Sequence, residues 1–253
     1  MKSPLKYIGG KSKLAETIIK MIPEHKTYCE VFAGAAWVFF RKEKSKFETL
    51  NDLDGDLVAF YRVLQNHLEE FLRQFKWMLA SREWFNDWNR QQKAGGLTDI
   101  QKAARYYYLQ RQCFGGRVRG RTYGAPGPDR RPAINLVRME EELSEVWLRL
   151  ADVQIENLPW YDLVKRYDRK QTFFYLDPPY YKAPCYQHNL ELEDYHIMAQ
   201  ALARISGRFI LSINDLPEMR KAFKGFKIQP VKLTYTVAKD KPTKAKELLI
   251  RNF

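Results

Sequence analysis

Cysteine and histidine are scarce in this sequence, and a long hydrophobic run is missing altogether. The three cysteines, Cys29, Cys113 and Cys185, lie far apart, and the four histidines form no cluster with them. This spacing excludes the usual zinc-binding and disulfide-framework patterns and favours reduced thiols. No apolar stretch approaches the roughly 18 residues of a membrane span, and the opening residues, MKSPLKYIGGK, lack the apolar core of a signal peptide. We therefore expect a cytoplasmic protein that needs neither a metal nor a membrane.

Negative charge is also in the minority, with 30 acidic residues against 43 basic ones, a formal net charge of +13 and a pI of about 9.5. The surplus is concentrated in two segments. Residues 111–138 hold seven arginines and one aspartate, and residues 220–253 hold ten basic and two acidic residues. A surplus of this size favours an anionic partner, most commonly nucleic acid, over charge that serves only solubility.

The hydrophobic pattern predicts an α/β fold, because short apolar runs alternate with amphipathic stretches. Residues 27–34 and 47–54 are typical of strands, the first ending in a glycine turn and the second in acidic residues. Helices are expected at 35–43, 56–79, 139–150, 192–207 and 216–225, and further strands at 172–177, 208–215, 226–233 and 245–253. The intervening stretch differs in character, since its helical patterns break at Gly95-Gly96 and lead into the arginine-rich loop. We therefore predict one α/β domain, residues 1–65 and 156–253, split by a helical, basic insertion at 66–155.

The stretch QTFFYLDPPYYKAP, residues 171–184, places Asp177 at the end of a buried strand. Open α/β sheets bind ligands at the carboxyl ends of their strands. Pro178 and Pro179 offer carbonyl oxygens without N–H groups, so together with the carboxylate they make a site of hydrogen-bond acceptors. Such a site suits an exocyclic NH₂ group, and Tyr180 offers a flat face on which a planar base can stack. The alternative is a structural turn in which the aspartate serves as a cap.

Two glycine-containing segments are candidates for a ligand pocket. In EVFAGAAW, residues 30–37, Gly34 lets the backbone approach a ligand, and Asp52 follows 18 residues later, where an acidic residue can bind a ribose. The full G-x-G-x-x-G pattern is absent, so an ordinary strand–helix turn is the alternative. PLKYIGGKSKL, residues 4–14, fails the spacing of a phosphate-binding P-loop, and a plain N-terminal turn remains open there.

With these motifs in this order, the sequence resembles the Dam-type DNA adenine methyltransferases of the DPPY class. The resemblance runs through most of the chain: KYIGGK, FAGAA, LNDLDGDLVAFYRVLQ, LDPPYY, ISGRFILSINDLPEMRKAF and KAKELLIRN all take part. It implies a Rossmann-like methyltransferase fold, a mixed sheet flanked by helices, with an inserted target-recognition domain. It also implies a bacterial or phage enzyme that transfers a methyl group from S-adenosyl-L-methionine to the exocyclic amine of adenine in double-stranded DNA. We expect this enzyme to need no metal and to be a monomer.

The resemblance assigns roles to individual residues. The flipped adenine would meet the acceptors and the stacking ring of the DPPY motif, which gives the catalytic set Asp177, Pro178, Pro179 and Tyr180. The cofactor would contact Tyr7, Lys11, Phe32, Gly34, Asp52 and Asp177. Ser212 and Asn214 would lie close to the pocket. In the insertion, Arg119 would read a base, whereas Arg117 and Arg121 would bind phosphate. Lys241 and Lys244 would contact the DNA backbone from a hairpin at 236–247.

The sequence departs from the family pattern at two positions. Ala36 stands where the F-x-G-x-G cofactor turn has its second glycine, and its methyl group is expected to crowd the methionine end of the cofactor. Gly115 stands where the family often has asparagine, so the recognised site is expected to differ from GATC. Three alternatives stay open at this point: a cytosine N4 methyltransferase, an RNA or protein-glutamine methyltransferase, and a catalytically silent DNA-binding relative, which Ala36 would favour.

Overall fold

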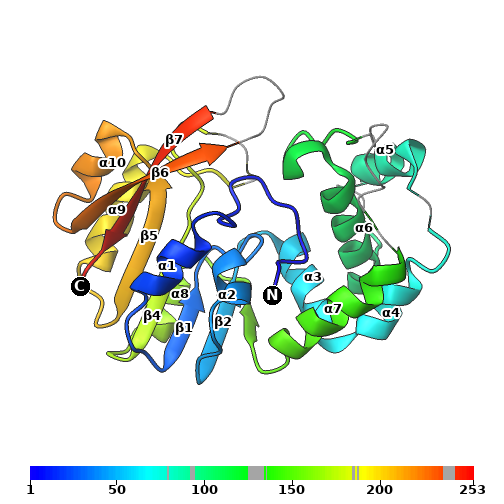
Figure 1. Cartoon of the computed structure of the whole chain (residues 1–253), viewed down its shortest axis with the longest axis horizontal. Coiled ribbons are helices and arrows are strands. Elements are labelled where there is room, and N and C mark those ends of the chain that lie inside the picture. The colour runs from blue at the N-terminus through cyan, green and yellow to red at the C-terminus, as the bar shows by residue number, and fades with distance from the viewer. Residues whose placement is uncertain are drawn as a thin grey trace.

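The computed structural model describes residues 1–78, 80–91, 95–124, 134, 136–183, 186, 188–235 and 243–253. Among these residues, seven strands form one sheet in the order β3-β2-β1-β4-β5-β7-β6 (Figure 1). The strands are β1 (Thr27–Glu30), β2 (Phe47–Asn51), β3 (Gln154–Glu156), β4 (Thr172–Leu176), β5 (Arg208–Asn214), β6 (Lys227–Tyr235) and β7 (Thr243–Arg251). The first five pair in parallel, whereas β7 runs antiparallel between β5 and β6. This mixed sheet flanked by helices confirms the predicted Rossmann-like α/β fold.

Helices cover both faces of the sheet because its strand residues alternate between two hydrophobic cores. In β4, Phe173 and Tyr175 pack on one side and Phe174 and Leu176 on the other. The first core includes residues of α1 (Ala15–Met21), α2 (Trp37–Arg41) and α3 (Gly55–Asn66). The second includes residues of α8 (Trp160–Tyr167), α9 (Leu192–Leu202) and α10 (Pro217–Ala222). The result is a three-layer arrangement with a sheet that is apolar on both faces.

The order of the strands creates a crevice beside β1. The chain first builds outward from β1 to β2, and later returns to place β4 on the other side of β1. Loops that leave the carboxyl ends of β1 and β4 therefore diverge, and an open α/β sheet binds its ligands at such a switch point. The glycine turn after β1 and Asp177 after β4 meet there.

The helical segment between α3 and β3 lies to one side of the sheet, at the right of Figure 1. It contains α4 (Leu68–Arg73), α5 (Arg82–Arg90), α6 (Asp99–Gln112), the short 3₁₀ turn η2 (Phe114–Gly116) and α7 (Leu136–Leu150). Phe60 of α3 contacts the rings of Phe71, Tyr106 and Tyr107, with ring centroids 5.7–6.1 Å apart. The segment thus shares a core with the sheet-side helices, and the boundaries at 66 and 155 stay a prediction.

Several elements differ from the sequence-based expectation. The single helix expected over 56–79 is wrong, because the chain leaves helical geometry at His67, where φ is −141° and ψ is 41°. The pattern gave no sign of α1, β3 or α8. Strand β3 has three residues of which only Ile155 is buried, which is too short for a visible alternation. The strand expected within residues 27–34 begins at Thr27 and ends at Glu30, and the glycine turn follows it.

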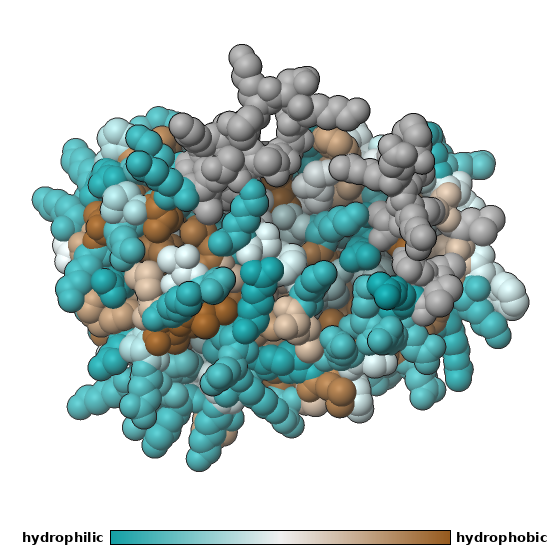
Figure 2. Space-filling model, in the orientation of Figure 1, coloured by the Kyte–Doolittle hydropathy of each residue, from teal (hydrophilic) through white to brown (hydrophobic). Residues whose placement is uncertain are grey.

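The surface is predominantly hydrophilic on the face shown in Figure 2, with hydrophobic patches between long polar side chains. Within the described ranges, no helix combines the length and the apolar character needed to cross a bilayer. Cys29 and Cys113 are free thiols buried in the protein. Cys185 lies outside the described residues.

Candidate active site

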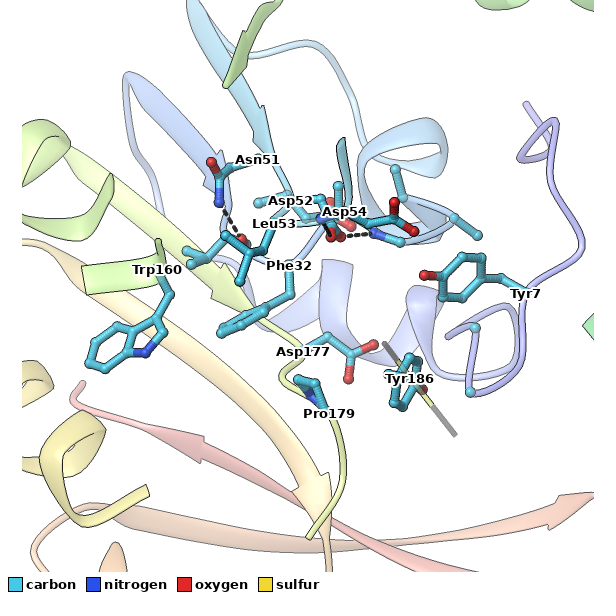
Figure 3. Close-up of a pocket in the computed structure, with 18 of the residues that line it drawn as sticks. Tyr7, Phe32, Asn51, Asp52, Leu53, Asp54, Trp160, Asp177, Pro179 and Tyr186 are labelled. Carbon is cyan, nitrogen blue, oxygen red and sulfur yellow. Dashed lines mark hydrogen bonds between the residues drawn. The ribbon is translucent and has the colours of Figure 1, made fainter. Parts of the chain in front are cut away.

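A pocket opens at the carboxyl ends of β1, β2 and β4, with about 1000 Å³ of empty space including its opening to solvent (Figure 3). It is lined by residues 7–11, the turn after β1, the end of β2, Val118, residues 158–160, the end of β4, and Tyr186, His188 and Leu190. The structure brings all six residues predicted to contact the cofactor to this pocket: Tyr7, Lys11, Phe32, Gly34, Asp52 and Asp177. These residues span 170 positions of sequence, so the sheet topology is what gathers them.

Asp177 is held in place by two contacts to its Oδ1 atom. The Nζ atom of Lys11 lies 2.7 Å away, and the hydroxyl of Ser212 donates a hydrogen bond of 3.0 Å. Tyr175 and Ser212 share a further hydroxyl contact of 2.9 Å. Burial raises the pKa of Asp177 to about 6, although the charge of Lys11 acts in the opposite direction. The carboxylate is therefore ionised at neutral pH only by a narrow margin.

Lys11 is buried, with its side chain 3% exposed. Besides Asp177, its ammonium group donates to the carbonyl oxygen of Gly9 at 3.0 Å, lies 4.0 Å from Glu247, and sits 4.6 Å from the centre of the Tyr180 ring. A buried ammonium needs such partners because leaving it unpaired would cost several kcal/mol, on the order of the desolvation of one ion. Lys11 thereby fixes the catalytic candidate Asp177 relative to the N-terminal glycine turn.

The other residues of the DPPY motif differ in their position relative to the pocket. Pro179 lines the pocket, Pro178 is buried, and Tyr180 packs against the second core. The carbonyl oxygen of Pro179 already accepts a hydrogen bond from the hydroxyl of Tyr195. Asn214, expected near the pocket, donates to the carbonyl oxygen of Tyr181 at 2.9 Å and so fixes the chain just after the motif.

The turn after β1 is tied to the end of β2. Gly34 has a φ of +48° and donates its N–H to Oδ2 of Asp52 at 2.9 Å, while the N–H of Asp54 donates to Oδ1 at 3.0 Å. A side chain at Gly34 would approach the Tyr7 ring to 3.3 Å. Burial raises the pKa of Asp52, and these backbone donors act against that rise. The turn thus presents backbone and a carboxylate to the pocket.

Ala36 adopts the left-handed conformation expected of the glycine it replaces, with φ 50° and ψ 40°, and is 1% exposed. L-residues other than glycine pay roughly 1–2 kcal/mol for this conformation. The immediate consequence of alanine is therefore backbone strain at the start of α2. The expected crowding of the cofactor stays a prediction.

Three residues important to the pocket were missed from the sequence. Glu30 lies in the pocket wall and accepts hydrogen bonds from the Tyr28 hydroxyl at 2.6 Å and the Phe39 N–H at 3.0 Å. Burial raises its pKa to about 8. Asn51 bonds the carbonyl oxygen of Val31 and both backbone groups of Leu158, at 2.9–3.0 Å, and so joins three pocket segments. Trp160, which follows β3, also lines the pocket (Figure 3).

The sequence held a partial signal for these residues. Glu30 and Asn51 each end a strand whose following turn was already a candidate, so position alone could have nominated them. Trp160 follows β3, the strand that the pattern did not reveal. Without that strand, nothing placed residues 158–160 next to the cofactor turn.

The predicted DNA-binding residues fall into three groups. Arg117 and Arg119 are exposed, and Arg119 lines a second open cleft beside the start of α3. Arg121 is only 7% exposed, and its guanidinium donates to the side chain of Gln110. Its surroundings are those of a structural arginine and not of a phosphate contact. Lys241 lies outside the described residues, and Lys244 belongs to β7 with its side chain likewise undescribed.

A search for metal-binding groups, confined to the part of the chain that the structure describes, finds no cluster of three or more His, Cys, Asp or Glu side chains able to hold an ion. The carboxylates of the pocket are instead bonded to backbone N–H groups, hydroxyls and Lys11. Carboxylate oxygens accept hydrogen bonds and attract cations, so these side chains suit an organic ligand that carries positive charge and hydroxyl groups.

Known proteins resemble this chain over most of its length. The type II methyltransferase M.CviBI of Paramecium bursaria Chlorella virus NC1A is 30% identical over 186 residues, covering 71% of this chain and 69% of that protein. The DNA adenine methylase of Vibrio cholerae serotype O1 is 25% identical over 264 residues, or 93% of this chain and 90% of its own. The DNA N-6-adenine-methyltransferase of Escherichia phage P1 is 25% identical over 91% of this chain, which spans 32% of the phage protein.

The sequence model of one family matches residues 7–237. That range includes the N-terminal glycine turn, the cofactor turn, the helical insertion and the DPPY motif. The match therefore extends over both the pocket and the segment that was predicted to contact DNA. This chain belongs to the D12 class of N6 adenine-specific DNA methyltransferases.

Proposed function

We propose that the pocket binds S-adenosyl-L-methionine and that Asp177 presents the N6 amine of a flipped adenine to it. The observation that carries this proposal is the position of Asp177, fixed by Lys11 and Ser212 at the rim shared with the cofactor turn. Membership of the N6 adenine-specific class supports adenine over cytosine as the target. Double-stranded DNA is then the substrate, and one copy of the chain holds every residue invoked.

The pocket fits this cofactor in charge. Two of its carboxylates, Asp52 and Asp177, suit a ligand with a sulfonium and an ammonium group. Asp52 would accept hydrogen bonds from ribose hydroxyls, and Phe32 and Trp160 would enclose the adenine ring. When bound, the cofactor would supply the electrophilic methyl group.

On the target side, this chain's residues would orient the amine. Both contacts of Asp177 involve Oδ1, so Oδ2 would accept one N6 proton. The Pro178 carbonyl would accept the other, since the Pro179 carbonyl already bonds Tyr195. Bonding both protons directs the nitrogen lone pair toward the methyl carbon. N6 would form a bond to the methyl carbon, the electron pair of the broken carbon–sulfur bond would stay on the sulfur of the departing S-adenosyl-L-homocysteine, and the displaced N6 proton would pass to Oδ2 of Asp177 and then to solvent. Tyr180 would stack on the base, and most of the rate gain would come from orientation.

Adenine N6 lies inside the duplex, so the base must be flipped into the pocket. The exposed Arg117 and Arg119 lie in the arginine-rich loop that follows α6. Arg119 would read a base edge, a contact worth roughly 1–3 kcal/mol of discrimination. Arg117 would bind phosphate and position the duplex.

A methyl-transfer assay tests the proposal directly. Tritiated S-adenosyl-L-methionine is incubated with unmethylated genomic DNA, and the nucleosides are analysed by mass spectrometry. We expect wild type to form N6-methyladenine, and methylation-aware sequencing then identifies the site. Asp177→Ala should lower the rate by at least about 100-fold, the size of a lost positioning group. Asp162→Ala, which removes an exposed aspartate on α8, serves as the matched control.

The outcomes separate the alternatives. If methylcytosine is the product, the target base is cytosine and not adenine. DNA binding without any methylated product would make the chain a silent relative. Equal activity of wild type and Asp177→Ala would remove Asp177 from the mechanism.

A further inference from the structure

Gln110, near the end of α6, is fully buried and bonds three residues that belong to two different segments. Its amide nitrogen donates to the carbonyl oxygen of Lys6 at 2.6 Å and to that of Gly116 at 2.7 Å. Its side-chain oxygen accepts from Nε and Nη2 of Arg121, at 3.3 and 3.2 Å. One side chain thus satisfies both of its amide protons and its oxygen in the interior. Buried networks of this kind specify one arrangement, because any shift leaves a polar group unpaired.

The first of these segments, residues 4–11, belongs to the pocket. Tyr7, Gly9 and Lys11 line it, and Lys11 forms an ion pair with Asp177. Tyr7 also packs against the cofactor turn, since a side chain at Gly34 would approach its ring to 3.3 Å. Any displacement of this N-terminal segment therefore changes the cofactor wall and the support of Asp177 together.

The second segment, residues 114–121, carries the exposed Arg117 and Arg119 and is called the recognition segment below. It touches the N-terminal segment directly. The carbonyl oxygen of Gly116 accepts the N–H of Ile8 at 2.9 Å, and a Cβ added to Gly116 would lie 2.9 Å from the Tyr7 nitrogen. Between the two arginines, Val118 is 3% exposed and lines the pocket. The recognition segment is therefore both an outer surface and a part of the pocket wall.

We propose that Gln110 is a positioning residue that couples the recognition segment to the cofactor pocket, so that specific DNA and cofactor bind cooperatively. The inference rests on the proposed function, because it takes segment 114–121 as the DNA contact. DNA that holds Arg117 and Arg119 restricts the recognition segment. Through Gln110 and Gly116 that restriction fixes the N-terminal segment, and with it Tyr7 and Lys11. Coupling between two binding sites is reciprocal, so bound cofactor should raise the affinity for specific DNA by the same factor by which DNA raises the affinity for the cofactor.

Binding of S-adenosyl-L-homocysteine, the product form of the cofactor, measures this coupling without turnover. Calorimetry gives its Kd alone and with a saturating duplex that carries the site identified by sequencing. We expect wild type to bind it about fivefold or more tightly with the duplex, the lower end of typical coupling. Gln110→Met keeps the volume but removes the hydrogen bonds, and we expect its ratio to fall to about one.

Tyr108→Leu is the matched control. Tyr108 lies on the same helix and is buried, and its hydroxyl bonds the backbone of Ser81 while its ring packs on Trp88 of α5. It should lower stability and leave the coupling ratio intact. Gln110→Glu is a second variant that keeps the acceptor for Arg121 and loses the donors to Lys6 and Gly116. It should also lose the coupling, and it serves if the methionine variant does not fold.

Two results would overturn the inference: a wild-type ratio near one, or wild-type coupling in a folded Gln110 variant. Neither result would contradict methyl transfer by the wild type. Failure of the proposed function shows itself separately, as an absence of methyladenine in the assay above.

Discussion

Among single residues, we expect Lys11 and Asp177 to set the acid limb of the pH profile of activity. Burial holds the pKa of Asp177 at about 6, so the carboxylate is lost as an acceptor when the pH falls through that value. We expect kcat/KM to decline below about pH 6. An opposite charge at this distance lowers an aspartate pKa by roughly 1–3 units. Lys11→Met should therefore move the acid limb to higher pH by about one unit or more.

Measuring kcat/KM for methyl transfer from pH 5 to 9 checks this prediction. Lys26→Met removes an exposed lysine and should leave the acid limb in place. An unmoved limb in Lys11→Met would show that another group controls the profile.

Ala36 offers a second residue-level prediction. Glycine would relieve the left-handed strain at this position, but it adds freedom to the unfolded chain and removes a buried methyl group. These effects oppose one another, so Ala36→Gly should change the free energy of unfolding by less than about 1 kcal/mol. A β-branched side chain has no such compensation, and Ala36→Val should destabilise the fold by roughly 2 kcal/mol or more.

Denaturant unfolding at neutral pH distinguishes the two variants. A mild effect of Ala36→Val would mean that the turn relaxes to another conformation. In that case strain does not explain why glycine suits this place.

For the elements, Glu30 has a particular role because its carboxyl group bonds the free N–H of Phe39 in the first turn of α2. Burial raises its pKa from the usual 4.5 to about 8. The unfolded chain therefore loses this proton first, and stability is lost as pH rises from about 4.5 to about 8. Glu30→Gln does not titrate and keeps an acceptor oxygen. Relative to wild type it should gain roughly 3 kcal/mol at pH 7 and little at pH 4.

The free energy of unfolding measured across pH 4 to 9 tests this expectation. Glu24→Gln changes an exposed glutamate and should follow the wild-type curve. Parallel curves for wild type and Glu30→Gln would mean that Glu30 titrates normally in the folded protein.

The elements also show how far the sequence could predict this fold. Strands β1, β2, β4 and β5 were evident because their apolar runs end in recognisable turns. The break at His67 was invisible, since apolar residues continue at helical spacing through α3 and α4. Lys11 was expected near the pocket through family resemblance, but its contact with Asp177 joins residues 166 positions apart. Gln110 gave no signal, because its partners are backbone carbonyls that any residue possesses.

For the whole molecule, we expect the net charge of +13 to dominate association with DNA. Each phosphate neutralised releases counterions, and log K falls with log salt by about 0.9 per contact. We expect a steep salt dependence for wild type and a slope smaller by about 1 for Arg117→Ala. Arg119→Ala should instead lose roughly 1–3 kcal/mol of discrimination at one base pair.

Fluorescence titrations with the identified duplex and with single-base variants, each at several salt concentrations, separate the two arginines. Lys170→Ala removes an exposed lysine on the chain before β4, and serves as the control. Equal losses for all duplexes in Arg119→Ala would reassign that arginine to the DNA backbone.

The antiparallel position of β7 has a consequence for the way this protein is made. Strand β7 lies between β5 and β6, and its Leu248, Leu249 and Ile250 are fully buried. A ribosome delivers β5 and β6 before β7, so the two strands cannot join the same sheet until residues 243–251 have left the exit tunnel. Throughout that interval the nascent chain displays the open edge of β5. A premature stop codon just upstream of residue 243 would therefore leave a polypeptide with every pocket residue present and no completed sheet to hold them.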